Sequence, residues 1–252
     1  MRRAARLGAL ALLVVLAGCT GSLGEEPVRD EQAVAAVEES KRALSGVESY
    51  RFATDLHVEA TDGGRTEQID ATSLGAVNAT AKRLDVTARI DDRTQRSYLL
   101  DRTNYRECPM PGAFWAVENQ TADEWVELTP AFKQLSLLSS GDLRTEGAAT
   151  VDGRAATHVV SEPSGEAFMQ YIDERNRPLI GGPEIRDPRV AVWIDNETHL
   201  PLKTRLRFTV AAEGGTATAE MVTRYRAYGE PVSVELPAEA REGHVLEGGC
   251  VG

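Results

Sequence analysis

The sequence predicts an α+β fold, in which one large curved antiparallel sheet, a half-barrel, has helices covering its concave face. Three observations predict it. Apolar and polar residues alternate with period two along many segments, and glycine-containing turns separate several of them. Stretches with helical spacing precede and interrupt these segments. A sheet of nine or ten such strands must curl, because strand twist accumulates and its one apolar face needs a cover.

The amino terminus has the three parts of a secretion signal. Three arginines lie among the first six residues, and residues 7–17 form an apolar run of 11 residues, too short for a membrane-spanning helix. The run ends in Leu16, Ala17, Gly18 and Cys19, a quartet that resembles the lipobox of prokaryotic lipoproteins. The resemblance implies that Cys19 receives a lipid and becomes the first residue of the mature chain. A free cysteine after a plain signal or a membrane anchor is the alternative, and the export route, Sec or Tat, stays open.

These features divide the chain into three parts. Residues 1–18 are expected to be a signal peptide, and residues 19–29 the lipidated cysteine with a short flexible tether. Residues 30–252 are expected to form a single domain, because no internal linker of similar composition follows. Lipid attachment would place this domain at the extracytoplasmic face of the cell membrane.

The folded part is expected to begin with an amphipathic helix over residues 30–46. Asp30 is a suitable N-cap and Gly46 a suitable stop. Apolar or small residues recur at spacings of three and four, as one helix face requires: Ala33, Val37, Ser40, Leu44 and Val47.

The period then changes to two. In residues 50–60 one face carries Tyr50, Phe52, Leu56 and Val58. Residues 83–90 repeat the alternation, with Leu84 and Val86 among the apolar residues. Further strands are expected at residues 65–77, 93–106, 143–151, 154–161, 190–195, 202–211 and 216–228, with turns at residues 61–64, 152–153 and 214–215.

Two later stretches have helical features. Within residues 122–140, Pro130 divides the segment and suits the first turn of a second helix that Thr129 would cap. Trp125 and Phe132 belong to the apolar face of this segment. The second stretch is residues 166–176, where the apolar residues are Phe168, Met169 and Ile172.

The order of these elements and the stretch "VWIDNETHLPLKTRLRF" resemble the LolA/LolB-like lipoprotein-carrier superfamily. The matching positions form a late hairpin: Trp193, Ile194, Asp195, Thr198, Leu200, Pro201 and Lys203. The stretch "YRAYGEPVSVELP" is similar to the closing strand of anchored mycobacterial relatives of the LppX and LprG type. The resemblance spans residues 30–237 in topology. It implies a half-barrel whose cavity holds acyl chains or glycolipids. The archetype of the superfamily is a soluble carrier between two membranes, whereas this chain is expected to carry its own lipid anchor.

No motif for catalysis is present in the sequence. The histidines His57, His158, His199 and His244 lack the spacing of a zinc site, and each is expected at the surface. Nucleophile-elbow, P-loop and dinucleotide patterns are missing as well. We therefore expect no enzyme, no cofactor and no metal. A formal net charge of -11 excludes nucleic acid as a partner and argues against basic binding patches of any kind.

What remains is an apolar concavity. Its side chains would either pack as a plain core or line an oily pocket, and the sequence leaves both open. We expect a membrane-anchored lipoprotein that binds a lipid, an acyl chain or another apolar ligand, as a carrier or chaperone. The alternative is an envelope sensor or adaptor that binds another protein through the same fold. The candidate cavity residues are Tyr50, Phe52, Leu56, Val58, Leu84, Val86, Trp125, Phe132 and Trp193.

Two cysteines and three asparagines complete the list of candidate sites. Cys108 and Cys250 form an even pair that can be one disulfide outside the cytoplasm. Two unpaired thiols, or a metal site lacking its other ligands, are the alternatives. Asn78, Asn119 and Asn196 lie in Asn-x-Thr triplets that are candidates for glycosylation. The triplets and the acidity together favour a haloarchaeal host. The alternative interpretation is that such triplets occur only because they favour turns.

Overall fold

The computed structural model describes residues 28–110, 112, 114–171, 184–212, 214–242, 244–247 and 250. The expected signal peptide, the lipobox of Leu16, Ala17, Gly18 and Cys19, and Ile172 lie outside the described residues. So does most of the expected tether.

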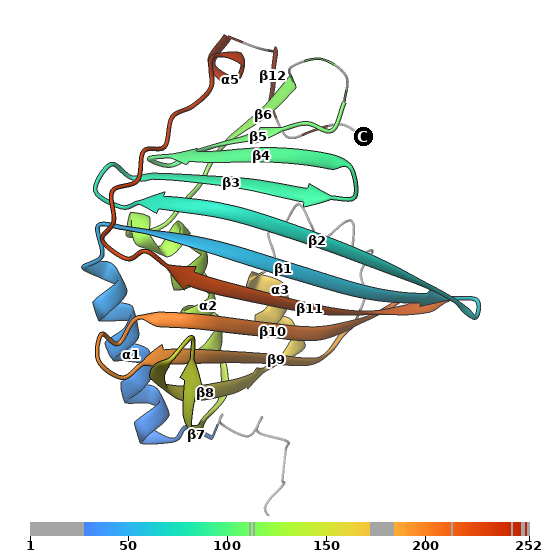
Figure 1. Ribbon diagram of the computed structural model, residues 1–252. Coiled ribbons are helices and arrows are strands. Elements are labelled where there is room, and N and C mark those ends of the chain that lie inside the picture. The colour runs from blue at the N-terminus through green and yellow to red at the C-terminus, as the bar shows by residue number, and fades with distance from the viewer. Residues whose placement is uncertain are drawn as a thin grey trace, which may run out of the picture.

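One large sheet contains all the named strands (Figure 1). Its order is β12-β6-β5-β4-β3-β2-β1-β11-β10-β9-β8-β7, and the two edge strands do not pair with each other, so the half-barrel is open. Neighbouring strands are antiparallel except β12, which is parallel to β6. The strands are β1 (Ser49–Asp62), β2 (Arg65–Asn78), β3 (Arg83–Ile90), β4 (Arg93–Leu100), β5 (Thr103–Glu107), β6 (Phe114–Asn119), β7 (Gly141–Val151), β8 (Arg154–Pro163), β9 (Glu184–Asp195), β10 (Pro201–Ala212), β11 (Gly215–Arg226) and β12 (His244–Glu247).

The twelve strands exceed the nine or ten expected, for local reasons. Residues 93–106 form the hairpin β4–β5 instead of one strand. The turn contains Asp101, whose φ of 50° is in the left-handed region. No glycine in the turn indicated this conformation in the sequence. The strands β6 and β12 are too short for a clear alternation. The strand β9 begins six residues before the expected start. The sequence did not reveal these residues, because Pro188 lies beside a register shift and interrupts the strand pattern.

The helices α1 (Glu31–Ser45), α2 (Pro130–Leu138) and α3 (Gly165–Tyr171) lie on the same face of the sheet, with the 3-10 helix η1 (Trp125–Leu128) beside α2 (Figure 1). They pack against β7, β8 and β9. The short helix α5 (Ala238–Glu242) lies near the other end of the sheet, next to β12. Among the described helices, none has the length and apolarity needed to cross a membrane.

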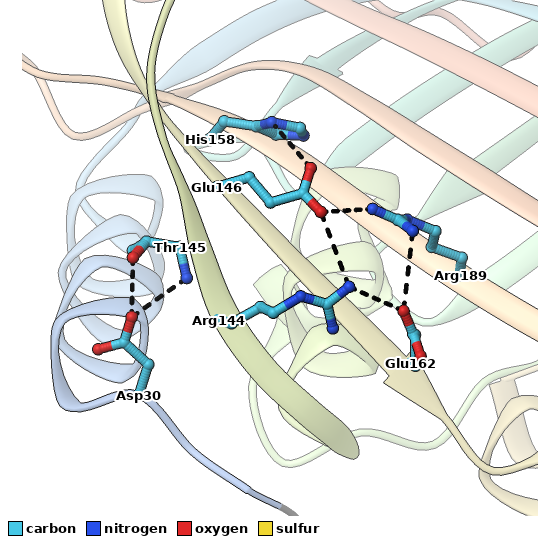
Figure 2. Close-up of polar contacts among 7 residues, drawn as sticks. All are labelled: Asp30, Arg144, Thr145, Glu146, His158, Glu162 and Arg189. Atoms are coloured by element: carbon cyan, nitrogen blue, oxygen red, sulfur yellow. Dashed lines mark hydrogen bonds and ion pairs between the residues drawn. The ribbon is translucent and has the colours of Figure 1, made fainter.

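The helix α1 matches its expected boundaries and buried face. The Asp30 side chain accepts a hydrogen bond from the Gln32 amide at 2.9 Å, as an N-cap does. Its other carboxylate oxygen accepts bonds from the Thr145 hydroxyl at 2.7 Å and the Thr145 amide at 3.2 Å (Figure 2). These bonds lower the pKa of Asp30. One carboxylate therefore caps the helix and joins it to β7.

The helix α2 begins at Pro130, as expected, but its cap differs. Thr129 occupies the N-cap position without a side-chain cap bond. Its hydroxyl instead donates to the Val126 carbonyl at 2.7 Å, in the preceding 3-10 helix. The cap prediction is thus correct in position and wrong in mechanism, because η1 competes for the same hydroxyl.

The segment 229–237, which we call the C-terminal segment, does not pair as a closing strand. It runs past the ends of β1 to β4 towards α5 (Figure 1). Its carbonyls accept hydrogen bonds from Ser49, Asn78 and Arg83, which all point to the face opposite the helices. Three of its apolar side chains are buried against that face: Val232, Val234 and Leu236.

The hairpin between β9 and β10 depends on a buried carboxylate. Asp195 accepts hydrogen bonds from the Glu197 amide at 3.0 Å and from the Thr198 amide and hydroxyl at 2.7 and 2.9 Å. Arg154 lies 2.8 Å away. Burial alone would raise the pKa of Asp195, but the bonds from Thr198 and Glu197 and the charge of Arg154 outweigh it, so the pKa is lowered.

Replacing Asp195 with alanine is expected to lower the free energy of unfolding by about 2 kcal/mol at pH 7, because charge-assisted hydrogen bonds are lost. The folded-state pKa is below the unfolded value of about 3.9, so this stabilisation is complete above that pH and is lost as pH falls through the folded value. Urea unfolding of both proteins between pH 3 and 7 measures the difference. Asp92→Ala, in an exposed turn, is the control. Equal stability of Asp195→Ala and the parent at pH 7 would contradict the prediction.

Candidate functional site

The first group of candidate residues lies beneath the helices. Tyr50 and Phe52 of β1 are buried in the main core cluster, together with Val77 of β2 and Tyr225 of β11. Phe52 is 3% exposed. Its ring lies over Gly75, where an added Cβ would come within 2.2 Å of the ring. A side chain at position 75 would collide with the ring, so this close approach requires glycine.

Four more candidates join the same cluster. Trp125 is buried, and its indole nitrogen donates to the Asp101 carbonyl at 2.6 Å. Leu84, Val86 and Phe132 are half-buried and pack against the cluster. Six of the nine candidate cavity residues therefore belong to the packed core or its margin.

A polar network that sequence reasoning missed lies within this core. Gln134 of α2 is buried and accepts hydrogen bonds from the Tyr225 hydroxyl at 2.6 Å and from the Thr204 hydroxyl. Its amide nitrogen donates to Thr223 at 3.5 Å, and Thr223 lies 2.9 Å from Thr54. The network fastens α2 to three strands. Its sequence signal was the threonines at inward positions of β1, β10 and β11.

Beyond this network the same face of the sheet becomes progressively more exposed. Leu56 and Val58 are half-buried, whereas Ile69 is 45% exposed and Ile90 is 47% exposed. The strand register places them on one face, since Leu56 faces Ala71, Val58 faces Ile69, and Ala71 faces Ile90. We call this set the apolar strip: Leu56, Val58, Ile69, Ala71, Ala88 and Ile90.

The apolar strip continues into a hollow. Ala88 and Ile90 line a cavity of about 960 Å³ together with Cys108, Pro109 and Met110. Its volume lies at the upper end of the range typical for small-molecule sites. Polar and charged residues of the β3–β4 hairpin form the rest of its lining: Asp91, Asp92, Arg93, Thr94 and Gln95, with Glu107 of β5.

The disulfide prediction is confirmed beside this hollow. Cys108 and Cys250 are joined, with their Cα atoms 5.3 Å apart. The bond ties the end of the chain to the loop between β5 and β6, which forms one wall of the hollow.

The prediction for Trp193 is wrong. Val192 and Ile194 belong to the core beneath the helices, so Trp193 faces the opposite, convex side of the sheet. There its ring stacks on His158 at a centroid distance of 4.3 Å, and the Lys203 ammonium lies 4.1 Å from it. The segment "VAVWI" is apolar at every position, so its alternation could not identify the inward face.

Of the three histidines whose side chains the structure describes, two follow the prediction. His57 and His199 are exposed. A hydrogen bond from His57 to Asp70 at 2.8 Å raises the pKa of His57. His158 is half-buried against Trp193, and burial lowers its pKa, so its surface placement is wrong. The His244 side chain lies outside the described residues, and no potential metal-binding group of three acidic, histidine or cysteine residues occurs in the described part of the chain.

Two of the three glycosylation candidates are exposed, Asn119 and Asn196. Asn78 is not. Its amide donates to the Val232 carbonyl at 2.7 Å and its side-chain oxygen accepts from the Ala81 amide at 2.9 Å. The C-terminal segment partly covers Asn78, so this candidate is less accessible than the other two.

Comparison with known proteins gives structural likenesses only. No family model matches the chain, and no curated protein sequence matches it. The chain is similar to the crystal structure of the Mycobacterium tuberculosis lipoprotein LppX, with 17% identity over 82% of this chain and 100% of that one, and a TM-score of 0.44. LprF from Mycobacterium bovis has 13% identity over 83% and 98%, with a TM-score of 0.40. A chain of the Pseudomonas aeruginosa MucA/MucB complex has 18% identity over 82% and 62%, with a TM-score of 0.39.

Proposed function

We propose that this protein is a lipoprotein, anchored through Cys19 at the extracytoplasmic face of the membrane, that binds a lipid, an acyl chain or another apolar ligand without catalysing a reaction. The observation that carries the proposal is the apolar strip that leads from the packed core into the 960 Å³ hollow. Carrier or chaperone activity would follow from reversible binding there.

Exposure of large apolar side chains supports this site. Ile69, Ile90 and Met110 are three of the five large hydrophobic residues that are exposed in the described part of the chain. Ile90 and Met110 both line the hollow. An acyl chain lying along the strip would cover such side chains, and each methylene removed from water would contribute about 0.8 kcal/mol.

The disulfide and the expected signal peptide support a location outside the cytoplasm. A bond between Cys108 and Cys250 persists where the surroundings are oxidising, as they are outside the cytoplasm. A lipidated Cys19 would keep the strip close to a bilayer, which is both a source and an acceptor of apolar ligands.

The test compares two substitutions on opposite faces of β2. Ile69→Glu places a carboxylate on the apolar strip, whereas Leu74→Glu places one on the convex face, where Leu74 is 59% exposed. We expect Ile69→Glu to weaken binding of cis-parinaric acid at least tenfold, equivalent to about 1.4 kcal/mol, and Leu74→Glu to leave it unchanged. Fluorescence titration measures the affinities, and melting temperatures confirm that both variants fold.

A second experiment tests whether protein purified from its own host carries bound lipid. Chloroform–methanol extraction followed by mass spectrometry should release lipid in a defined molar ratio from the parent and less from Ile69→Glu. Lipid-free protein with no saturable fatty-acid binding would overturn the proposal. A stoichiometric protein partner, captured by crosslinking to lipid-free protein, would instead favour the sensor or adaptor role.

A further inference from the structure

The convex face of the sheet carries a second pocket, distinct from the apolar strip. Its volume is about 260 Å³. Val160 of β8 and Ala191 of β9 are opposed in the sheet register and supply apolar lining, with Trp193 beside them. Charged side chains and a histidine complete the lining: Glu146, His158, Arg189, Arg205, Arg207 and Glu220.

The three arginines of this pocket are crowded together. Arg207 of β10 stands directly opposite Arg189 of β9, and Arg205 lies two residues away on the same face. Like charges in directly opposed positions destabilise a sheet. The register therefore concentrates positive charge here without a gain in folding stability from the arginine pair itself.

Carboxylates compensate this charge only in part. Arg189 pairs with Glu146 and lies 3.7 Å from Glu162 (Figure 2). Arg205 lies 3.7 Å from Glu220. Arg207 makes no ion pair within the described residues, although Glu220 occupies the register position on its other side.

Two neighbouring basic side chains, Lys203 and His158, have lowered pKa values. Burial lowers the pKa of Lys203, and the charges of Arg205 and Arg224 lower it further. Burial likewise lowers the pKa of His158, and Arg189 and Lys203 add to the effect while Glu146 opposes it. Burial is the larger cause in both cases, and the arginine charges act in the same direction, in a chain whose formal net charge is -11.

We propose that this pocket binds a small anionic group, a phosphate or a carboxylate, among Arg189, Arg205 and Arg207, with the attached apolar part of the ligand beside Trp193. Guanidinium groups present paired donors that match both anions. An anion would relieve the repulsion that the sheet register imposes. The volume suits a small organic acid or phosphate ester and is below the range of larger ligands. Binding of this kind would run against the expectation, drawn from the net charge, that basic binding patches are disfavoured.

The test uses full-length protein and calorimetric titration with phenyl phosphate, benzoate and inorganic phosphate at constant ionic strength. We expect saturable binding of at least one of them, and at least tenfold weaker binding to Arg207→Gln. Arg226→Gln is the matched control, because Arg226 is an exposed arginine on the same face, at the end of β11 and outside the pocket lining. It should bind as the parent does.

Stability measurements separate ligand binding from a structural role. Without anion, the melting temperature of Arg207→Gln should equal or exceed that of the parent, because a repulsive pair is removed. Phenyl phosphate should raise the melting temperature of the parent and not that of Arg207→Gln. Saturable binding of the soluble anions identifies a free ligand. Binding seen only with phosphatidylglycerol vesicles, and lost in Arg207→Gln, identifies a headgroup.

Three results would overturn the proposal. One is the lack of saturable binding to both the soluble anions and the vesicles. Another is equal weakening by Arg207→Gln and Arg226→Gln, which would indicate a general charge effect. The third is a lower melting temperature of Arg207→Gln together with lost binding, which would assign Arg207 to the fold.

Discussion

Phe52→Ala is expected to lower the free energy of unfolding by about 3–5 kcal/mol, the usual cost of removing a buried aromatic ring. The ring is 3% exposed, contacts the core cluster and lies over Gly75. The three heavy atoms nearest to a Cβ at that position all belong to the Phe52 ring, so removal of the ring would leave a cavity. Chemical unfolding monitored by circular dichroism measures the change, and Leu74→Ala, an exposed site on β2, should cost less than about 0.5 kcal/mol.

Gly75→Ala tests the same contact from the other side. The added Cβ would lie 2.2 Å from the Phe52 ring, so we expect a loss of about 1–3 kcal/mol from overpacking. In a Phe52→Ala background the same substitution should cost much less, because the ring is no longer there. Additive costs in this double-mutant cycle would show that the ring and the glycine do not interact as described.

Loss of the disulfide is the second large expected effect. Cys108→Ser with Cys250→Ser should lower the free energy of unfolding by about 2–5 kcal/mol, because the bond closes a loop across a sequence separation of 142 residues. Thermal unfolding of the double variant, compared with the parent, measures it. Equal stability of the two proteins would contradict the prediction.

Hydrogen exchange should show where the disulfide acts. The strand β12 has four residues and, among the described strands, pairs with β6 alone, so its amides should exchange faster once the bond is removed. The C-terminal segment should change little, because Val232 and Val234 are buried and their carbonyls accept bonds from Asn78 and Arg83. The amides of β1 serve as the unaffected reference.

The elements that the sequence predicted correctly are those with a local signal. The helix α1 has spacings of three and four between an aspartate and a glycine, and its buried residues are the ones that this spacing selects. The turn at Asp152 and Gly153 has positive φ at both residues, as the Asp-Gly pair predicts. The hairpin at Asp101 was missed because an aspartate adopted the left-handed conformation without such a pair.

The candidate site likewise has a part that local sequence pattern predicted and a part that it did not. Alternation placed Tyr50, Phe52, Leu56 and Val58 on one face of β1, and the structure agrees. Alternation could not tell that the helices bury the first two while the last two extend towards the exposed apolar strip. That difference depends on where α2 and its Gln134 network end over the sheet, which the alternation along β1 does not show.

The sequence by itself determined which side chains share a face, where α1 begins and ends, and which cysteines could pair, because spacing along the chain sets these. Only the tertiary structure decided that Trp193 and His158 lie on the convex face, that the C-terminal segment partly covers Asn78, and that Arg207 stands opposite Arg189. The physical reason is that a strand's two faces look alike to a local pattern. Their surroundings come from strands and segments that are distant in sequence.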